Sequence, residues 1–151
     1  MLKRSKNRAL VLACSQRKKP HASLMPAIDR YDGPAFRVLH RYLREEEDRQ
    51  LKVYILSAEF GLISSNNPIP YYDRRMTAAR ALELREGTTP ILESLLRQHA
   101  CSELFLCASK IYQQAIDQST LMRLLPVRYA ASGQGPKLAS LHRWLREKSN
   151  G

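Results

Sequence analysis

Four short apolar runs, separated by stretches long enough for helices, constrain the fold of this chain more than any other feature. They cover residues 9–14 (ALVLAC), 52–57 (KVYILS), 103–109 (ELFLCAS) and 126–131 (PVRYAA). Apolar runs at such wide spacing are typical of parallel strands that are buried on both faces and joined by crossover helices. The sequence therefore predicts an α/β fold, a single three-layer domain with a mostly parallel central sheet of at least four strands and helices on both faces.

The stretches between the strands carry apolar residues at helical spacing, which predicts five helices. Gly87 is expected to end the second helix, and Pro90, preceded by two threonines, is expected to begin the third. The expected helices cover residues 34–48, 77–86, a segment that starts at Pro90, 110–121 and 136–148. At 151 residues the chain has the length of one domain, 1–151, in which we expect the termini, 1–7 and 148–151, to be flexible.

The charge balance points to a polyanionic partner. Lys and Arg number 25 against 14 Asp and Glu, which gives a net charge of +11. Such an excess favours contact with phosphates because neutralising them releases condensed counterions. We therefore expect nucleic acid or a nucleotide as the partner. No run of eighteen apolar residues is present, and the first apolar run fits a strand better than a signal-peptide core, so we expect a cytoplasmic protein without a membrane partner.

Cysteine and histidine spacing argues against a metal site. The three cysteines, Cys14, Cys101 and Cys107, form no CxxC pair, and the four histidines are scattered. We therefore expect no metal, no cofactor and no disulfide framework. The sequence leaves the oligomeric state open.

In parallel sheets, ligands bind outside the carboxyl ends of the strands, so the residues that follow each strand are the candidate site. The first strand leads into Cys14, Ser15 and Lys18, a thiol and a hydroxyl beside a dense cationic run that can hold an anion. Cys14 or Lys18 is the expected nucleophile, and Ser15 is expected to bind the ligand. A buried, inert Cys14 is an equally open interpretation.

The second strand is followed by small, acidic and aromatic residues. Glu59 and Asp73 are expected to transfer protons as catalytic residues. Small side chains would let a ligand approach the backbone, and a tyrosine would stack on a base. The expected ligand-binding residues here are Ser57, Ala58, Gly61, Tyr71 and Tyr72. A structural interpretation also fits, with Gly61 in a turn and the tyrosines covering the edge of the core.

The last two strand ends carry a hydroxyl and a glycine-rich turn. Ser109 follows the third strand, where it would cap the next helix and bind a ligand. Gly133, Gly135 and Lys137 stand between the fourth strand and the last helix. Two glycines before a helix expose backbone N–H groups in an arrangement that binds phosphate. We therefore expect these four residues to bind the ligand.

These segments carry a family resemblance. The sequence resembles the superfamily that joins YaaA-like peroxide-stress proteins to small domains of unknown function, and the resemblance implies a compact α/β domain able to bind DNA. The resemblance rests on the motifs Ala13-Cys14-Ser15-x-x-Lys18, Tyr31-x-Gly33, residues 56–62 (LSAEFGL), Pro70-Tyr71-Tyr72-Asp73 and Gly133-x-Gly135-x-Lys137. The resemblance adds Tyr31 to the expected ligand-binding residues.

The first loop is also similar to a motif of archaeosine synthase, a tRNA-modifying enzyme that adds lysine to a deazaguanine base. Cys14, Lys18 and Pro20 have counterparts in that motif, with Lys19 inserted and His21 in place of tyrosine. The similarity implies base chemistry.

Two functions from different classes fit the sequence, and a third is possible. The first is a nucleotide- or nucleic-acid-acting enzyme with a phosphate-binding groove at the strand ends and base or glycosidic-bond chemistry. The alternative is a non-catalytic DNA/RNA-binding module in a stress response, whose affinity would fall steeply with salt. The third is an assembly partner that docks its basic surface onto an acidic protein.

Overall fold

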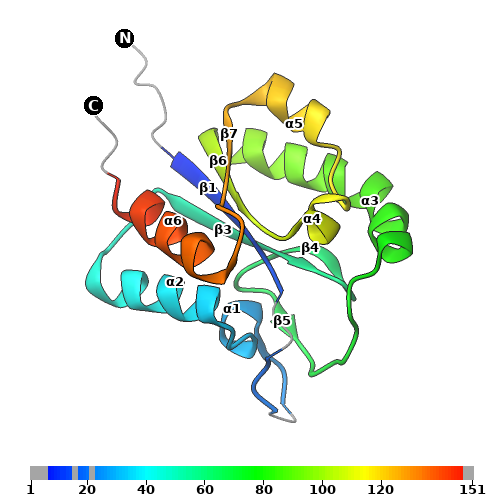
Figure 1. The fold of residues 1–151 in the computed structure, drawn as a ribbon, viewed down its shortest axis with the longest axis horizontal. Helices are drawn as coiled ribbons and strands as arrows, with labels where there is room; N and C mark the ends of the chain where they lie inside the picture. The colour runs from blue at the N-terminus through cyan, green and yellow to red at the C-terminus, as the bar shows by residue number, and fades with distance from the viewer. Residues whose placement is uncertain (1–6, 15–16, 21–22, 148–151) are drawn as a thin grey trace.

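The computed structural model describes residues 7–14, 17–20 and 23–147, and it confirms the predicted three-layer α/β architecture (Figure 1). The central sheet has five strands in the order β4-β3-β1-β6-β7. They are β1 (Asn7–Ala13), β3 (Leu51–Ser57), β4 (Gly61–Ser64), β6 (Cys101–Cys107) and β7 (Val127–Tyr129). Four strands run parallel, and β4 pairs antiparallel with β3 at one edge.

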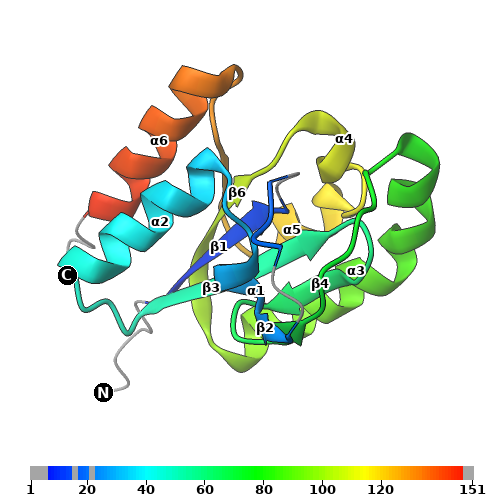
Figure 2. The ribbon, with the colours of Figure 1, turned by 90° about the horizontal axis from the view of Figure 1, so that it is seen from below.

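Helices cover both faces of this sheet (Figure 2). One face carries α2 (Pro34–Glu45) and α6 (Gln134–Arg146), which pack against each other. The other carries α3 (Ala78–Gln98) and α5 (Gln118–Leu124). The short elements are α1 (Ala27–Arg30), α4 (Lys110–Gln113), and the two-stranded pair of β2 (Met25–Pro26) with β5 (Pro68–Ile69). No helix in the described part of the chain is both long and apolar enough to cross a membrane.

The core is centred on β1, which lies between β3 and β6. Leu10 and Leu12 are fully buried, as expected for a strand covered on both faces. On the α6 side, the Trp144 ring stacks on Phe105 with a centroid distance of 5.0 Å. This burial of apolar surface fixes the sheet and thereby brings the carboxyl ends of β1, β6 and β7 to one edge.

The prediction of one helix over residues 77–86 and another that begins at Pro90 was wrong, because α3 continues through Gly87 and Pro90. A proline inside a helix costs about 3 kcal/mol and bends the axis. The axis of α3 does change direction between its two halves (Figure 1). Burial of Thr88, Thr89 and Leu92 offsets the local cost, and Thr89 Oγ1 also accepts a hydrogen bond of 2.9 Å from the Asp117 amide.

The prediction of one helix over residues 110–121 was also wrong, because the segment is divided into α4 and α5. Asp117 is the N-cap of α5, and its side chain accepts hydrogen bonds from the amides of Ser119 and Thr120. Ala115 and Ile116 are buried in the turn between the helices. A strong N-cap inside an apolar pattern therefore starts a new helix.

Candidate functional site

Three adjoining hollows lie at the carboxyl ends of β1, β6 and β7, and together we call them the strand-end trough. Their volumes are about 490, 160 and 770 Å³. Ser109 lines all three, Cys14 and Tyr112 line the first two, and Lys137 lines the last two. The shared residues show that the hollows adjoin one another, and they lie at the edge where parallel sheets bind ligands.

The wall of the trough is cationic. Among the described lining residues, Asp73 is the one carboxylate. The cations are Lys18, Arg74, Arg75, Lys110 and Lys137. A concave surface with charges of one sign concentrates ligands of the other sign, so the trough favours an anion.

A thiol and a phenol meet in the middle of the trough. Cys14 follows β1 directly, and its amide donates a 2.8 Å hydrogen bond to the Leu56 carbonyl, which holds its backbone at the end of β3. Its Sγ lies 3.1 Å from Tyr112 Oη. Burial and the neighbouring Cys14 raise the pKa of Tyr112, so the phenol stays protonated at neutral pH and keeps a proton to donate.

Three hydroxyls form a chain beside Cys14. Ser57 Oγ accepts hydrogen bonds from the amides of Glu59 and Phe60, both at 3.1 Å, so its own proton is directed to Tyr72 Oη at 2.9 Å. Tyr72 Oη in turn is hydrogen-bonded to Tyr31 Oη. Burial raises the pKa of Tyr31 to about 12, so this tyrosine is neutral at physiological pH.

Lys18 connects this hydroxyl chain to the trough. Its Nζ lies 4.7 Å from the ring centroid of Tyr72 and 6.0 Å from that of Tyr31. A cation over aromatic faces is held by the negative quadrupole of the rings. The two tyrosine rings therefore hold the Lys18 ammonium in place, and Ser57 is hydrogen-bonded to one of them, Tyr72. None of these three residues lines the trough itself.

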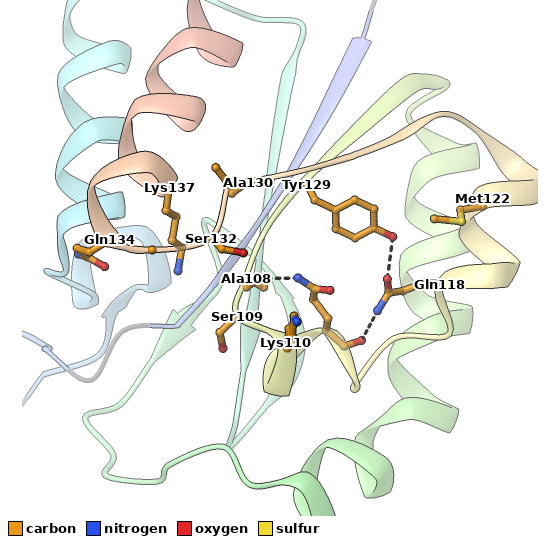
Figure 3. A pocket seen from close by; sticks show the side chains of 13 residues that line it. Ala108, Ser109, Lys110, Gln118, Met122, Tyr129, Ala130, Ser132, Gln134 and Lys137 are labelled. Atoms are coloured by element: carbon orange, nitrogen blue, oxygen red, sulfur yellow. Dashed lines mark hydrogen bonds between the residues drawn. The ribbon is translucent and has the colours of Figure 1, made fainter.

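The predicted phosphate loop lies at the opposite end of the trough. Gly133 is the N-cap of α6 with φ of +88°, a conformation that favours glycine. Lys137, Ser132 and Ser109 surround the same hollow (Figure 3). The helix begins at Gln134, so Gly135 lies in its first turn and is not among the lining residues. The cradle thus consists of one glycine turn, two hydroxyls and a lysine.

The far wall of this hollow is a chain of hydrogen-bonded polar side chains that the sequence did not predict. Tyr129 Oη donates to Gln118 Oε1 at 2.7 Å, and Gln118 Nε2 donates to the Gln113 carbonyl at 3.2 Å. Gln113 Nε2 then donates to the Ala108 carbonyl at 2.9 Å (Figure 3). Isolated glutamines give no sequence signal, because their role depends on partners in other elements.

The remaining predicted residues lie away from the trough. Glu59 faces Arg74 across 3.5 Å, and the exposed Tyr71 is not a lining residue. Ala58 and Gly61 are buried, and the Ala58 carbonyl accepts a 2.8 Å hydrogen bond from Arg80. Ser15 lies outside the described residues. The trough therefore brings together Cys14, Lys18, Asp73, Ser109, Gly133 and Lys137 out of the predicted set.

Arg30 is a positioning residue that the sequence did not single out. It is fully buried and donates to the carbonyls of Lys19 at 2.8 Å, Ile69 at 3.2 Å and Ser23. These bonds tie the segment after β1 to β5. In the sequence this residue stands in the segment Asp29-Arg30-Tyr31-Asp32, whose charges are typical of an exposed surface. Its burial is therefore evident only from the tertiary structure.

The described residues contain no group of three or more His, Cys, Asp or Glu side chains that could hold a metal ion. The sheet topology and the trough together define the class of this protein, a three-layer α/β domain with a cationic depression at the ends of its parallel strands.

The chain belongs to DUF6884, a family of unknown function, which it matches over residues 9–146. No curated protein matches the chain. It is similar to the crystal structure of AF0587, a protein of unknown function, with 16% identity and a TM-score of 0.45. The match covers 95% of this chain and 46% of that one, so this chain spans about half of its length.

Proposed function

We propose that this protein is an enzyme that binds a nucleotide unit across the strand-end trough and acts on its base or glycosidic bond. The observation that carries the proposal is that the hollows of the trough adjoin one another and share Cys14, Tyr112, Ser109 and Lys137. Cys14 and Tyr112 line it between a cationic end with Lys18 and a cationic end with Lys137. A nucleotide has the matching layout, with an anionic phosphate at one end and a reactive base or sugar carbon within reach of the thiol.

Each part of the trough has a role in this proposal. The phosphate lies against Gly133 and Lys137, where a lysine and the helix start favour an anion. For a glycosidic bond, Cys14 Sγ attacks the sugar carbon as the bond from that carbon to the base breaks, and Tyr112 Oη, 3.1 Å from Sγ, donates a proton to the departing base. Asp73 accepts the thiol proton, since it is the carboxylate in the described lining, whereas Glu59 is not a lining residue and pairs with Arg74 of the trough wall at 3.5 Å.

The family resemblance supports the same chemistry. The resemblance to YaaA-like proteins implies DNA binding, and the first loop, with Cys14 and Lys18, is similar to a motif of an enzyme that modifies a tRNA base. In this proposal the partner is nucleic acid or a nucleotide and the protein works in the cytoplasm, where such substrates are present.

Binding is the first test. Titration calorimetry with the nucleoside monophosphates and with the same nucleosides separates a phosphate requirement from base recognition. We expect the monophosphates to bind more tightly than the nucleosides. Equal affinity of both would contradict a phosphate site at Gly133 and Lys137.

Turnover is the second test. Nucleosides, modified tRNA and damaged DNA are incubated with the protein, and products are detected by mass spectrometry. We expect Cys14→Ala and Asp73→Asn to lose product formation, and Glu59→Gln to serve as the matched control that retains it. Full activity in both trough variants would remove these residues from the mechanism.

The alternative is a non-catalytic DNA/RNA-binding module. It is favoured by exposed cations on α6 such as Arg143, which lies outside the trough. That function predicts nucleic-acid binding that weakens steeply with salt and no chemical change in any of the substrates above.

A further inference from the structure

A second basic hollow lies beside α2, outside the strand-end trough, and we call it the α2 groove. Its volume is about 530 Å³. Lys19, Arg37, Arg41 and Arg44 supply its cations, and Asp29 and Asp32 supply its carboxylates. His142 of α6 and His40 also line it. The positive side chains therefore outnumber the acidic ones even with both histidines neutral.

The three arginines form a row. Arg37, Arg41 and Arg44 have i, i+4, i+7 spacing, which places them on one side of the helix. At 1.5 Å per residue the row is about 10 Å long. All three side chains are exposed, and the acidic residues Glu45 and Glu46 follow immediately and end the row. A row of evenly spaced cations is complementary to a row of evenly spaced anions.

Two members of the row form no salt bridge in the described part of the chain. Arg37 is 3.4 Å from Asp32, and hydrogen bonding from Arg37 lowers the pKa of that carboxyl, so Asp32 is ionised at neutral pH. In the described part of the chain, no carboxylate lies within salt-bridge distance of Arg41 or Arg44. These two guanidinium groups are thus available to an external anion.

The α2 groove and the trough are neighbours. The residues of the first turn of α2, Pro34, Ala35 and Phe36, line the 160 Å³ hollow of the trough, and the next residue, Arg37, lines the groove. Likewise Lys18 lines the trough and Lys19 lines the groove. A ligand longer than one nucleotide would therefore reach both by passing the first turn of α2.

We propose that the α2 groove binds the phosphate backbone of a polynucleotide strand, one unstacked nucleotide of which occupies the trough. This inference rests on the proposed function and names its substrate class as a polynucleotide rather than a free nucleotide. A base inside a duplex is stacked and paired, so it reaches a trough only from a single strand or after flipping. Guanidinium groups in a row provide forked contacts to successive phosphates.

The test compares two double variants that remove the same charge. Arg41→Gln with Arg44→Gln alters the groove, and Arg97→Gln with Arg123→Gln alters α3 and α5 on the other face of the sheet. Fluorescence anisotropy measures the binding of a short single-stranded oligonucleotide over a series of salt concentrations. Calorimetry measures the binding of a mononucleotide to the same proteins.

We expect the groove variant to bind the oligonucleotide about tenfold more weakly at ~0.1 M salt, because two phosphate contacts are lost. The slope of log K against log salt concentration should become less steep by about 1.4, since each contact to a single strand contributes about 0.7. The control variant should keep the wild-type slope, and both variants should bind the mononucleotide like the wild type.

Three results would overturn the inference. They are a wild-type affinity for the oligonucleotide in the groove variant, an equal loss in the control variant, and competition by polyglutamate as strong as that by the oligonucleotide. The last would indicate an acidic protein as the partner. If the groove variant loses oligonucleotide binding while the wild type binds no mononucleotide, the groove is supported and the proposed function of the trough fails.

Discussion

The two ends of the central sheet both carry charged, tyrosine-containing hollows, but their charges are arranged differently. At the amino end, a hollow of about 320 Å³ is lined by Arg8, Tyr42 and Asp48. The Arg8 guanidinium donates to the carbonyls of Trp144 at 2.7 Å and Leu145 at 3.1 Å and to Asp48 at 3.3 Å. Tyr42 Oη donates to the same carboxylate at 2.7 Å. This network is compensated within the protein, and it anchors the last turn of α6.

At the carboxyl end, the trough has several cations around Asp73, the one carboxylate of its described lining. Its thiol and phenol, Cys14 and Tyr112, are in contact with each other, and both residues line the trough although Cys14 is largely buried. The two hollows differ in charge balance: Arg8 and Asp48 are paired at the amino end, whereas cations outnumber carboxylates in the described lining of the trough, an arrangement that favours an anionic ligand.

Removing the centre of the amino-end network should have the largest effect. Arg8→Met removes the charged donor to Asp48 and to the Trp144 and Leu145 carbonyls, and leaves the largely buried carboxylate without its counter-charge, so we expect the free energy of unfolding to fall by about 3 kcal/mol. Urea denaturation measures this. Nucleotide affinity of the folded fraction should not change, and a loss of affinity would contradict the division of roles between the two ends.

Ser57→Ala should have the next largest effect. The substitution removes the acceptor of two amide protons and the donor to Tyr72 in a fully buried place, so we expect a loss of about 2 kcal/mol. Tyr72→Phe is the matched comparison, with an expected loss of about 1 kcal/mol, because the serine still accepts both amides. Equal losses in thermal or urea unfolding would show that the amide contacts contribute nothing.

Lys137→Gln should affect binding and leave stability unchanged. A charge-assisted hydrogen bond to phosphate contributes about 1.5 kcal/mol, so we expect the affinity for nucleoside monophosphates to fall about tenfold. Calorimetry gives the affinity, and urea denaturation gives the stability. Lys52→Gln, a partly exposed lysine on β3 outside the trough, is the control. A similar loss of affinity in the control would indicate a diffuse charge effect.

The smallest effect concerns pH at the amino end. Burial alone would raise the pKa of Asp48, but hydrogen bonds from Tyr42, the Gln50 amide and Arg8 outweigh it and hold the pKa below its ordinary 3.8. The carboxylate therefore contributes stability that is present above that value and is lost as the pH falls through the lower, folded pKa.

Denaturation curves from about pH 2 to pH 7 check this contribution. We expect Asp48→Asn to be less stable near neutral pH and to lack this part of the acid dependence, and Glu46→Gln, an exposed neighbour, to keep the wild-type curve. An unchanged acid dependence in Asp48→Asn would show that the network does not depend on this charge.

The sequence by itself determined the fold class and much of the trough. Continuous apolar runs predict strands buried on both faces, and these became β1, β3, β6 and β7. Since the carboxyl ends of parallel strands share one edge, polar residues at those ends, including Cys14, Ser109 and Lys137, were predicted to lie together, and they line one trough.

Only the tertiary structure decided the features that depend on contacts between distant segments. Local signals predicted a break at Gly87 and Pro90, but burial of the threonines between them keeps α3 continuous. The sequence predicted the same catalytic role for Glu59 and Asp73, yet Asp73 lines the trough, whereas Glu59 is not a lining residue and pairs with Arg74. The physical reason is that local pattern reports backbone preference and exposure, whereas side-chain partners are set by packing across the whole chain.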